Sequence, residues 1–137
     1  MYIHVQRNSA VDLSATKNCH CLAARKRARE TTRRYDEKLR PHGLQSTQFS
    51  VLAALALKGP TPLGELADTL GLERTTLTRS ANRLEDEGWV TDAEAEDARK
   101  RCLQLTADGH TKVEEAYPAW KQVQDEIDRQ ETRLETE

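Results

Sequence analysis

Residues 74–90, RTTLTRSANRLEDEGWV, combine a helical spacing of apolar residues with side chains that form helices poorly. Leu77, Ala81 and Leu84 lie three or four residues apart, which predicts a helix with one buried stripe. Thr, Ser and Asn stabilise a helix less than Ala, Glu or Lys, so their presence needs another reason. With the apolar stripe inward, the outer side of this helix holds Thr75, Thr78, Arg79, Asn82 and, at the flank, Arg83.

These outward groups are of the types that contact DNA. Arginine can form two hydrogen bonds with guanine O6 and N7, and asparagine can form two with adenine N6 and N7. Threonine can bond a phosphate or contact a thymine methyl group. The acids Glu85, Asp86 and Glu87 come only at the C-terminal end, away from the end expected to enter a groove. The segment therefore predicts a DNA-recognition helix, with an ordinary surface helix as the alternative.

The neighbouring segments predict elements that would position such a helix. Thr61 and Pro62 are suited to the N-cap and first position of a short preceding helix. That helix is indicated by the spacing of Leu63, Leu66, Ala67 and Leu70. A tight turn at Gly71 separates the two helices, and Gly88 ends the second. Two short β runs, 89–91 and 101–105, then enclose nine polar residues, which predicts a two-stranded hairpin. This order of elements predicts a winged helix-turn-helix.

The tip of the hairpin, EAEDARKR at residues 94–101, carries bases after a run of acids. Arg99 and Lys100 at such a tip can reach an adjacent minor groove, where narrow A·T tracts concentrate negative potential. Asp97 can hold the Arg99 side chain by a charge-assisted hydrogen bond. The alternative is a solvated loop, since the acids nearly balance the bases.

Long helices are expected on both sides of this domain. Between residues 19 and 40 one helical stripe is formed by Cys21, Ala24, Ala28, Thr31, Tyr35 and Leu39, and Pro41 and Gly43 end it. A helix over 47–57 should direct inward Phe49, Leu52, Ala53 and Ala56. After Thr106, a seven-residue recurrence comprises Val113, Trp120, Ile127 and Leu134. This recurrence suggests packing along another helix, with a kink at Pro118, or alternatively a helix lying on its own domain.

The composition and motifs of the sequence exclude several classes of protein. The 137 residues suffice for one domain with a core that needs no disulfide or metal. No run approaches the roughly 20 apolar residues that span a bilayer, and the first residues lack the apolar segment of a signal peptide, so we expect a cytoplasmic protein without membrane contact. The net charge of −2 conceals a basic segment, with eight Lys/Arg and three Asp/Glu between Arg25 and Arg40. No phosphate loop, nucleophile elbow or paired acid–base motif is visible, so we expect no enzyme and no cofactor.

Three motifs together resemble the MarR family of bacterial winged-helix transcription regulators. They are the T-x-x-T-R-like segment Thr75–Arg79, the D-x-R pair Asp97 and Arg99, and the LT-x-x-G segment 105–109. The resemblance covers roughly residues 20–127. It implies a homodimer on a pseudo-palindromic operator, usually a repressor released by a small ligand or by oxidation. It also places DNA contacts on Arg74, Thr75, Thr76, Thr78, Arg79, Arg83 and Arg99, with Asp97 as the organiser of the wing. The family usually has one more C-terminal helix at the dimer interface, and this chain has little apolar sequence after Ile127.

Two hypotheses remain for the signal that releases the repressor from its operator. Cys21 precedes Tyr35 by fourteen residues, a spacing similar to the organic-hydroperoxide-sensing branch of the family, and Cys19 lies close by. That branch has another tyrosine where this chain has Ser46, and a small buried residue is the commoner role of cysteine. Three cysteines fit no disulfide framework, and one C-x-C cluster provides too few ligands for zinc, so no metal is expected. The second hypothesis is a phenolic or aromatic effector in a cleft lined by Arg25, Tyr35, His42 and Phe49.

The predicted organisation has four parts. Residues 1–17 form a tail or arm, 18–44 a first dimerisation helix, 45–105 the winged helix-turn-helix domain and 106–137 a C-terminal dimerisation helix. The fold class is mainly α with a small β wing. The leading function is sequence-specific DNA binding as a homodimeric repressor. The alternatives are a thiol-based peroxide-sensing repressor that uses Cys21, and a winged-helix module that binds proteins instead of DNA.

Overall fold

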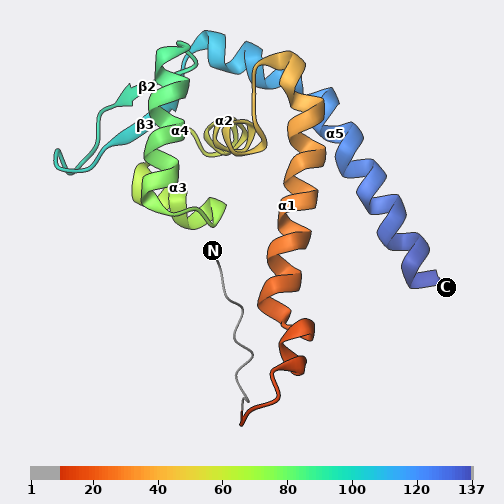
Figure 1. The fold of residues 1–137 in the computed structure, drawn as a ribbon. Helices are drawn as coiled ribbons and strands as arrows, with labels where there is room; N and C mark the ends of the chain where they lie inside the picture. Colours follow the sequence, from red (N-terminus) through yellow and green to blue (C-terminus); the bar gives the residue numbers. More distant parts are fainter. Residues whose placement is uncertain (1–9, 137) are drawn as a thin grey trace, which may run out of the picture. The chain divides into compact units, whose positions relative to one another are not determined.

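The computed structural model describes residues 10–136, with side chains to residue 135, and confirms a mainly helical fold with a small β-sheet (Figure 1). No helix in this described range is long and apolar enough to cross a membrane. In chain order the elements are η1 (Ser14–Asn18), α1 (His20–Leu39), η2 (Arg40–His42), α2 (Ser46–Lys58), β1 (Thr61–Pro62), α3 (Leu63–Leu70), α4 (Arg74–Asp86), β2 (Val90–Ala93), β3 (Cys102–Leu105) and α5 (Ala107–Thr136).

The chain divides into two compact units, with the division inside α1 between Thr31 and Thr32. In the N-terminal unit every described residue is exposed. The expected tail, 1–17, contains the start of the 3-10 helix η1, while residues 1–9 lie outside the described residues. The predicted helix is present as α1, and along its predicted stripe Cys21, Ala24, Ala28 and Thr31 are exposed, whereas Tyr35 and Leu39 in the second unit are covered.

The core of the second unit, residues 32–136, is built around α2. This helix is apolar on several sides because α3, α4, α5 and β3 all pack against it. Val51, Leu52 and Leu55 are buried, as is Phe49, whereas Ala56 is exposed and not inward as expected. The face of α2 that contacts the other elements is centred on Val51, Leu52 and Leu55. Ala54 lies on this face and is buried in place of Ala56.

The predicted hairpin is confirmed as β2 and β3, and in the described residues a further strand, β1, extends it to an antiparallel sheet in the order β1-β3-β2. Thr61 and Pro62 form β1, with Thr61 opposite Leu103 and Pro62 opposite Cys102. The prediction of a helix N-cap at Thr61 is therefore wrong. Thr61 is buried and its hydroxyl donates to the Gly59 carbonyl at 2.8 Å, while α3 begins only at Leu63. A third strand anchors the base of the hairpin to the start of α3.

The start of α5 is fixed to the turn that follows α4. The Thr106 hydroxyl donates to the Gly88 carbonyl at 2.6 Å and accepts from the Gly109 backbone N–H at 3.0 Å, which makes Thr106 the N-cap. The Thr106 N–H donates to the Trp89 carbonyl at 3.1 Å. A Cβ atom on Gly109 would lie 2.0 Å from the same Trp89 oxygen. Gly109 is therefore needed where helix and turn approach each other closely.

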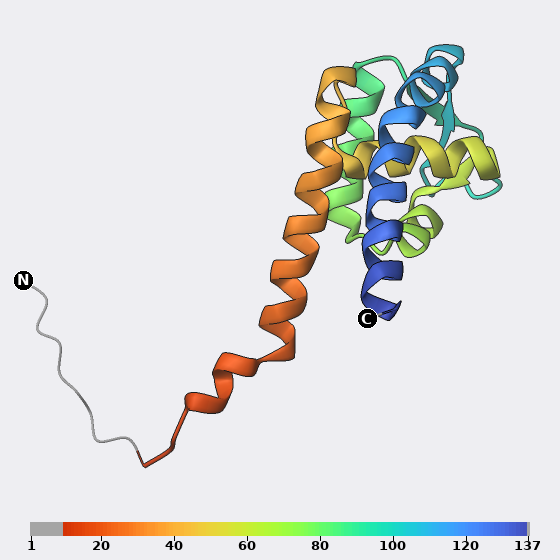
Figure 2. The ribbon, with the colours of Figure 1, turned by 90° about the vertical axis from the view of Figure 1, so that its right-hand side faces the viewer.

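Helix α5 crosses α2 and packs on its own unit (Figure 2), and its contacts with α1 in that unit continue as far as Gln130, which accepts from Arg34. Val113, Ala116 and Val123 are buried, while Leu134 near the end is 71% exposed. Pro118 lies inside a helix that stays continuous, and the ribbon of α5 is bent (Figure 1). The alternative interpretation, a helix lying on its own domain, thus describes α5 as far as Gln130, and Leu134 in its last turns is uncovered.

Candidate nucleic-acid interface

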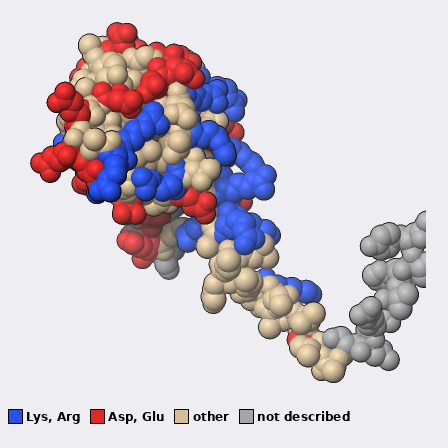
Figure 3. All heavy atoms as spheres, turned by 90° about the vertical axis from the view of Figure 1, so that its left-hand side faces the viewer, with Lys and Arg blue, Asp and Glu red and all other residues tan. Residues whose placement is uncertain are grey.

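The outer face of α4 gathers the side chains that were predicted to contact DNA. Leu77, Ala81 and Leu84 are fully buried, as predicted, so the rotation of α4 about its axis is fixed by the core. Opposite them a groove of about 430 Å³ is lined by Arg74, Thr75, Thr78, Arg79 and Asn82. Lys and Arg side chains gather on the face that carries α4 and the hairpin, with Asp and Glu around them (Figure 3). The groove is thus open to solvent and is lined by two arginines, two threonines and an asparagine.

Two of the predicted contacts lie away from this groove. Thr76 is exposed but does not line the groove. Arg83 lines a different pocket, together with Asp36, Arg40 and the start of α2. The structure therefore brings together five of the seven predicted α4 side chains and places Arg83 beside a second arginine at the flank.

The wing, residues 94–101 at the tip of the β2–β3 hairpin, has the local order that its sequence predicts. The Asp97 carboxylate accepts from the Arg99 backbone N–H at 3.0 Å and from Arg99 Nε at 3.2 Å. These two bonds, the backbone one first, lower the pKa of Asp97 below its usual value. The Arg99 side chain remains 91% exposed. The predicted bond between Asp97 and Arg99 is confirmed, and it holds the guanidinium at Nε while the side chain stays open to solvent.

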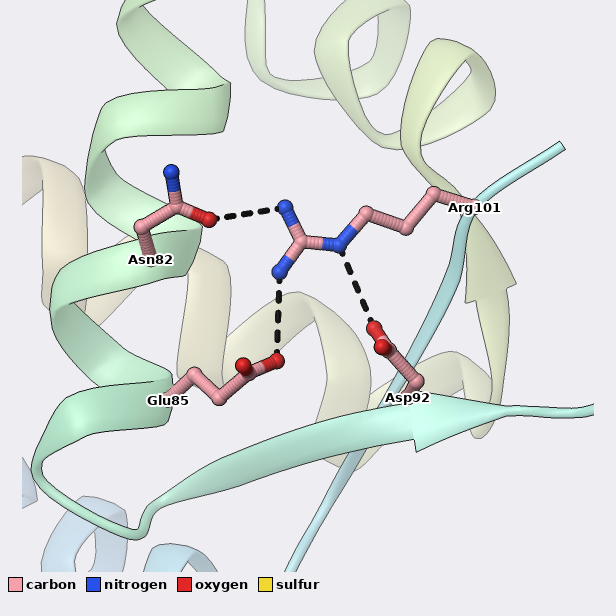
Figure 4. Close-up of polar contacts among 4 residues, drawn as sticks. All are labelled: Asn82, Glu85, Asp92 and Arg101. Atoms are coloured by element: carbon pink, nitrogen blue, oxygen red, sulfur yellow. Dashed lines mark hydrogen bonds and ion pairs between the residues drawn. The ribbon is translucent and has the colours of Figure 1, made fainter.

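Arg101, which sequence reasoning placed only among the bases of the tip, holds the hairpin to α4 (Figure 4). Its Nε donates to Asp92 Oδ1 at 3.2 Å, its Nη1 to Asn82 Oδ1 at 2.9 Å and its Nη2 to Glu85 Oε2 at 3.2 Å. Asp92 lies opposite Leu103, two residues from Arg101, so the two side chains form a diagonal cross-strand pair. The role of Arg101 follows from the register of β2 against β3. That register could not be assigned from the length of the loop between the two strands.

The residues predicted to bind an effector are divided between the two units. Tyr35 and Phe49 both lie against Trp120, with ring centroids 6.2 Å and 5.8 Å from it. Burial, and then the charge of Asp128, raise the pKa of the Tyr35 hydroxyl above its usual value. His42 lies in η2, where its carbonyl accepts from Lys112, and Arg25 belongs to the N-terminal unit. A pocket of about 280 Å³ nevertheless adjoins Phe49 and Trp120, between α2, α3 and α5.

Cys19 and Cys21 are exposed free thiols in the N-terminal unit, whereas Cys102 is buried in β3. Arg25, one helical turn after Cys21, places Nη2 3.6 Å from the Cys21 sulfur. The expectation that Cys21 is a small buried residue does not hold in this chain by itself. The exposed sulfur and its cationic neighbour are features that reactive cysteines share.

Known proteins match both the sequence and this geometry. A profile of the MarR family matches residues 42–101, from η2 to the base of β3. The regulator MosR of M. tuberculosis, solved in complex with DNA, is 41% identical, with a TM-score of 0.72 and 80% of each chain covered. The chain belongs to the MarR family. The structure of reduced AbfR bound to DNA is 30% identical, with a TM-score of 0.69 and 88% of each chain covered.

Among curated proteins, the uncharacterised HTH-type transcriptional regulator YwoH of Bacillus subtilis is 40% identical over 88 residues, 64% of this chain. The chain spans 64% of the length of YwoH and 49% of that of the next curated relatives. These relatives are named as transcriptional regulators, not as enzymes.

Proposed function

We propose that this chain is a transcription repressor that binds a pseudo-palindromic operator as a homodimer, with α4 in the major groove and the wing in the adjacent minor groove. The observation that carries the proposal is the groove lined by Arg74, Thr75, Thr78, Arg79 and Asn82 on a helix whose rotation is fixed by three buried residues. The DNA complexes of MosR and AbfR support it. A protein-binding module would need an apolar outer face on α4, and these five side chains are polar.

Selection of genomic DNA fragments bound by the purified chain tests this function. We expect an inverted repeat whose half-sites lie about one helical turn apart. Binding equally strong to any duplex would contradict the proposal and would favour the protein-binding alternative.

The homodimer is proposed because apolar and small residues remain uncovered on the elements outside the winged domain. In the N-terminal unit they include Leu13, Leu22, Ala24 and Ala28, and in α5 they include Leu134. A two-fold related copy would cover the same residues on both chains, which is how symmetric dimers form. The two α4 helices would then face two half-sites. The expected cytoplasmic location remains part of this proposal.

We expect Arg99→Ala to weaken operator binding and to flatten its dependence on salt. Each phosphate contact that is lost lowers the slope of log K against log salt by about 0.9. Binding of a selected duplex at several salt concentrations measures the slope. Lys121→Ala is the matched control, since it removes one exposed positive charge on α5 where the ammonium pairs with Asp125 at 2.7 Å. An equal slope for wild type and Arg99→Ala would remove the wing from the interface.

Two features of the structure could control release of the operator, the exposed thiol of Cys21 and the pocket beside Phe49 and Trp120. The thiol is considered first because a single substitution tests it. A Cys21 thiolate would attack the distal oxygen of an organic hydroperoxide, so that the O–O bond breaks, a sulfenic acid forms and the alkoxide leaves as an alcohol after taking a proton. The Arg25 guanidinium lies beside this sulfur, with Nη2 at 3.6 Å. We expect hydroperoxide to weaken operator binding in wild type and not in Cys21→Ser. Cys19→Ser shows whether the second exposed thiol takes part, and an equal response of wild type and Cys21→Ser would refute thiol sensing.

The pocket beside Phe49 and Trp120 is proposed as the site of an aromatic effector. Its walls include Ala53, Leu57 and Leu70, and Lys58 at its edge donates to Thr69 Oγ1 at 2.8 Å. Such a lining suits a flat apolar ring with an anionic substituent near the ammonium group. Repeating the operator titration with phenols and aromatic carboxylates tests this site, and no change in affinity with any of them would argue against it.

A further inference from the structure

The contact between Arg101 and Asn82 restricts what Asn82 can present to DNA. Asn82 is one of the five residues that line the α4 groove, and its side-chain oxygen accepts from Arg101 Nη1 at 2.9 Å. A guanidinium has five N–H donors and no acceptor, so it can pair only with the oxygen of an amide. The orientation of the Asn82 amide is therefore fixed by chemistry: its oxygen faces Arg101 and its NH₂ group points away from it (Figure 4).

Arg101 is held firmly enough to maintain this orientation. All three of its nitrogens donate to side chains, two of them to the carboxylates of Glu85 and Asp92, which neutralise its charge. Its side chain is 29% exposed. Its backbone carbonyl accepts from the Leu63 N–H at 2.9 Å, so the residue is tied to α3 as well as to α4 and β2. A DNA phosphate would have to displace two carboxylates to draw this guanidinium away.

We propose that Arg101 sets the base preference of Asn82, so that Asn82 reads guanine in preference to adenine. The proposal rests on the proposed DNA-binding function. Two bonds to adenine require the amide to donate to N7 and to accept from the N6 amino group. With its oxygen turned toward Arg101, the Asn82 amide presents its N–H donors on the side that faces away from Arg101. Guanine presents two acceptors, N7 and O6, side by side, whereas adenine presents N7 alone and an amino group that would face a donor. Arg101 is thus a positioning residue that acts on DNA through Asn82.

The test uses the full chain and a duplex obtained by selection. The base pair read by Asn82 is the one at which Asn82→Ala loses discrimination among the four bases. At that pair we expect wild type to bind guanine roughly tenfold more tightly than adenine, the lower range for one well-formed base contact. In Arg101→Met the amide is released, and we expect the order to reverse in favour of adenine. Arg99→Met is the matched control: it removes an arginine of the same wing that does not touch Asn82, and it should lower affinity for all four bases without changing their order.

Each outcome supports or contradicts the proposed effect of Arg101 on the base preference of Asn82. A wild type that prefers adenine at this pair overturns the proposal, as does an Arg101→Met variant that keeps the wild-type order. If Asn82→Ala alters discrimination at no position, Asn82 reads no base and the proposal is wrong. Should Arg101→Met not fold, Glu85→Gln loosens Arg101 more gently and should reduce the guanine preference, and an unchanged preference then contradicts the proposal. Failure of wild type to bind any duplex specifically overturns the proposed function, whereas specific binding with an unchanged base order overturns only the role of Arg101.

Discussion

Arg79→Ala should weaken operator binding by about 1–3 kcal/mol, the usual contribution of an arginine that pairs with a guanine edge. Arg79 is exposed in the middle of the α4 groove, and the buried residues Leu77 and Ala81 on either side of it fix its direction. Its loss should also relax sequence preference at one base pair in each half-site. Titration of the selected duplex and of its single-base variants measures both effects.

Arg79→Lys separates base reading from simple charge. Lysine retains the positive charge but not the planar fork that forms two parallel hydrogen bonds. We therefore expect Arg79→Lys to keep most of the affinity for a scrambled duplex and to lose discrimination at the same base pair as Arg79→Ala. If both variants bind the selected duplex as tightly as wild type, α4 does not read DNA through Arg79.

Gly109→Ala should destabilise the winged domain by at least about 1–3 kcal/mol, the usual cost of overpacking. The added Cβ would lie 2.0 Å from the Trp89 carbonyl oxygen, a backbone atom that cannot rotate away. To relieve the overlap, the start of α5 must move from the turn after α4, which strains the bonds of Thr106 to Gly88 and Trp89. Thermal unfolding followed by circular dichroism measures the change, with roughly 4–8 °C expected per kcal/mol.

Gly64→Ala is the matched control, since Gly64 is also in the first turn of a helix. There the nearest atom to an added Cβ is Nη1 of Arg74 at 3.4 Å, the end of a flexible side chain. Alanine is a better helix former than glycine, so we expect Gly64→Ala to be neutral or slightly stabilising. Gly109→Ala and Gly64→Ala should therefore differ in sign. Equal melting temperatures for the two variants would show that the close approach of α5 to the turn has no energetic importance.

The recognition helix could be predicted from sequence because its buried stripe and its polar face repeat with a helical period. Leu77, Ala81 and Leu84 fix one face, and Arg79 and Asn82 follow on the other. Strand β1 could not be predicted, because two residues, Thr61 and Pro62, carry no periodic signal and pair only through β3.

The role of Arg101 was hidden for a related reason. In the sequence it stands beside Arg99 and Lys100 and looks like a third basic residue of the tip. Only the strand register, which sets Asp92 opposite Leu103, separates an arginine bound to α4 from one that projects into solvent. The stripe from Cys21 to Thr31 could be predicted as a helical face, and in the described part of the chain it is exposed.

The most direct test of the central claim, that the α4 groove reads a specific DNA sequence, is the ratio of affinities for the selected inverted repeat and a scrambled duplex of the same composition. Measured at physiological salt for wild type and for Arg79→Ala, this ratio should be at least about 10³ for wild type, the lower range of specific regulators. It should fall roughly five- to a hundredfold in the variant, as loss of one base contact implies. A wild-type ratio near one, or a ratio that Arg79→Ala leaves unchanged, would contradict the account.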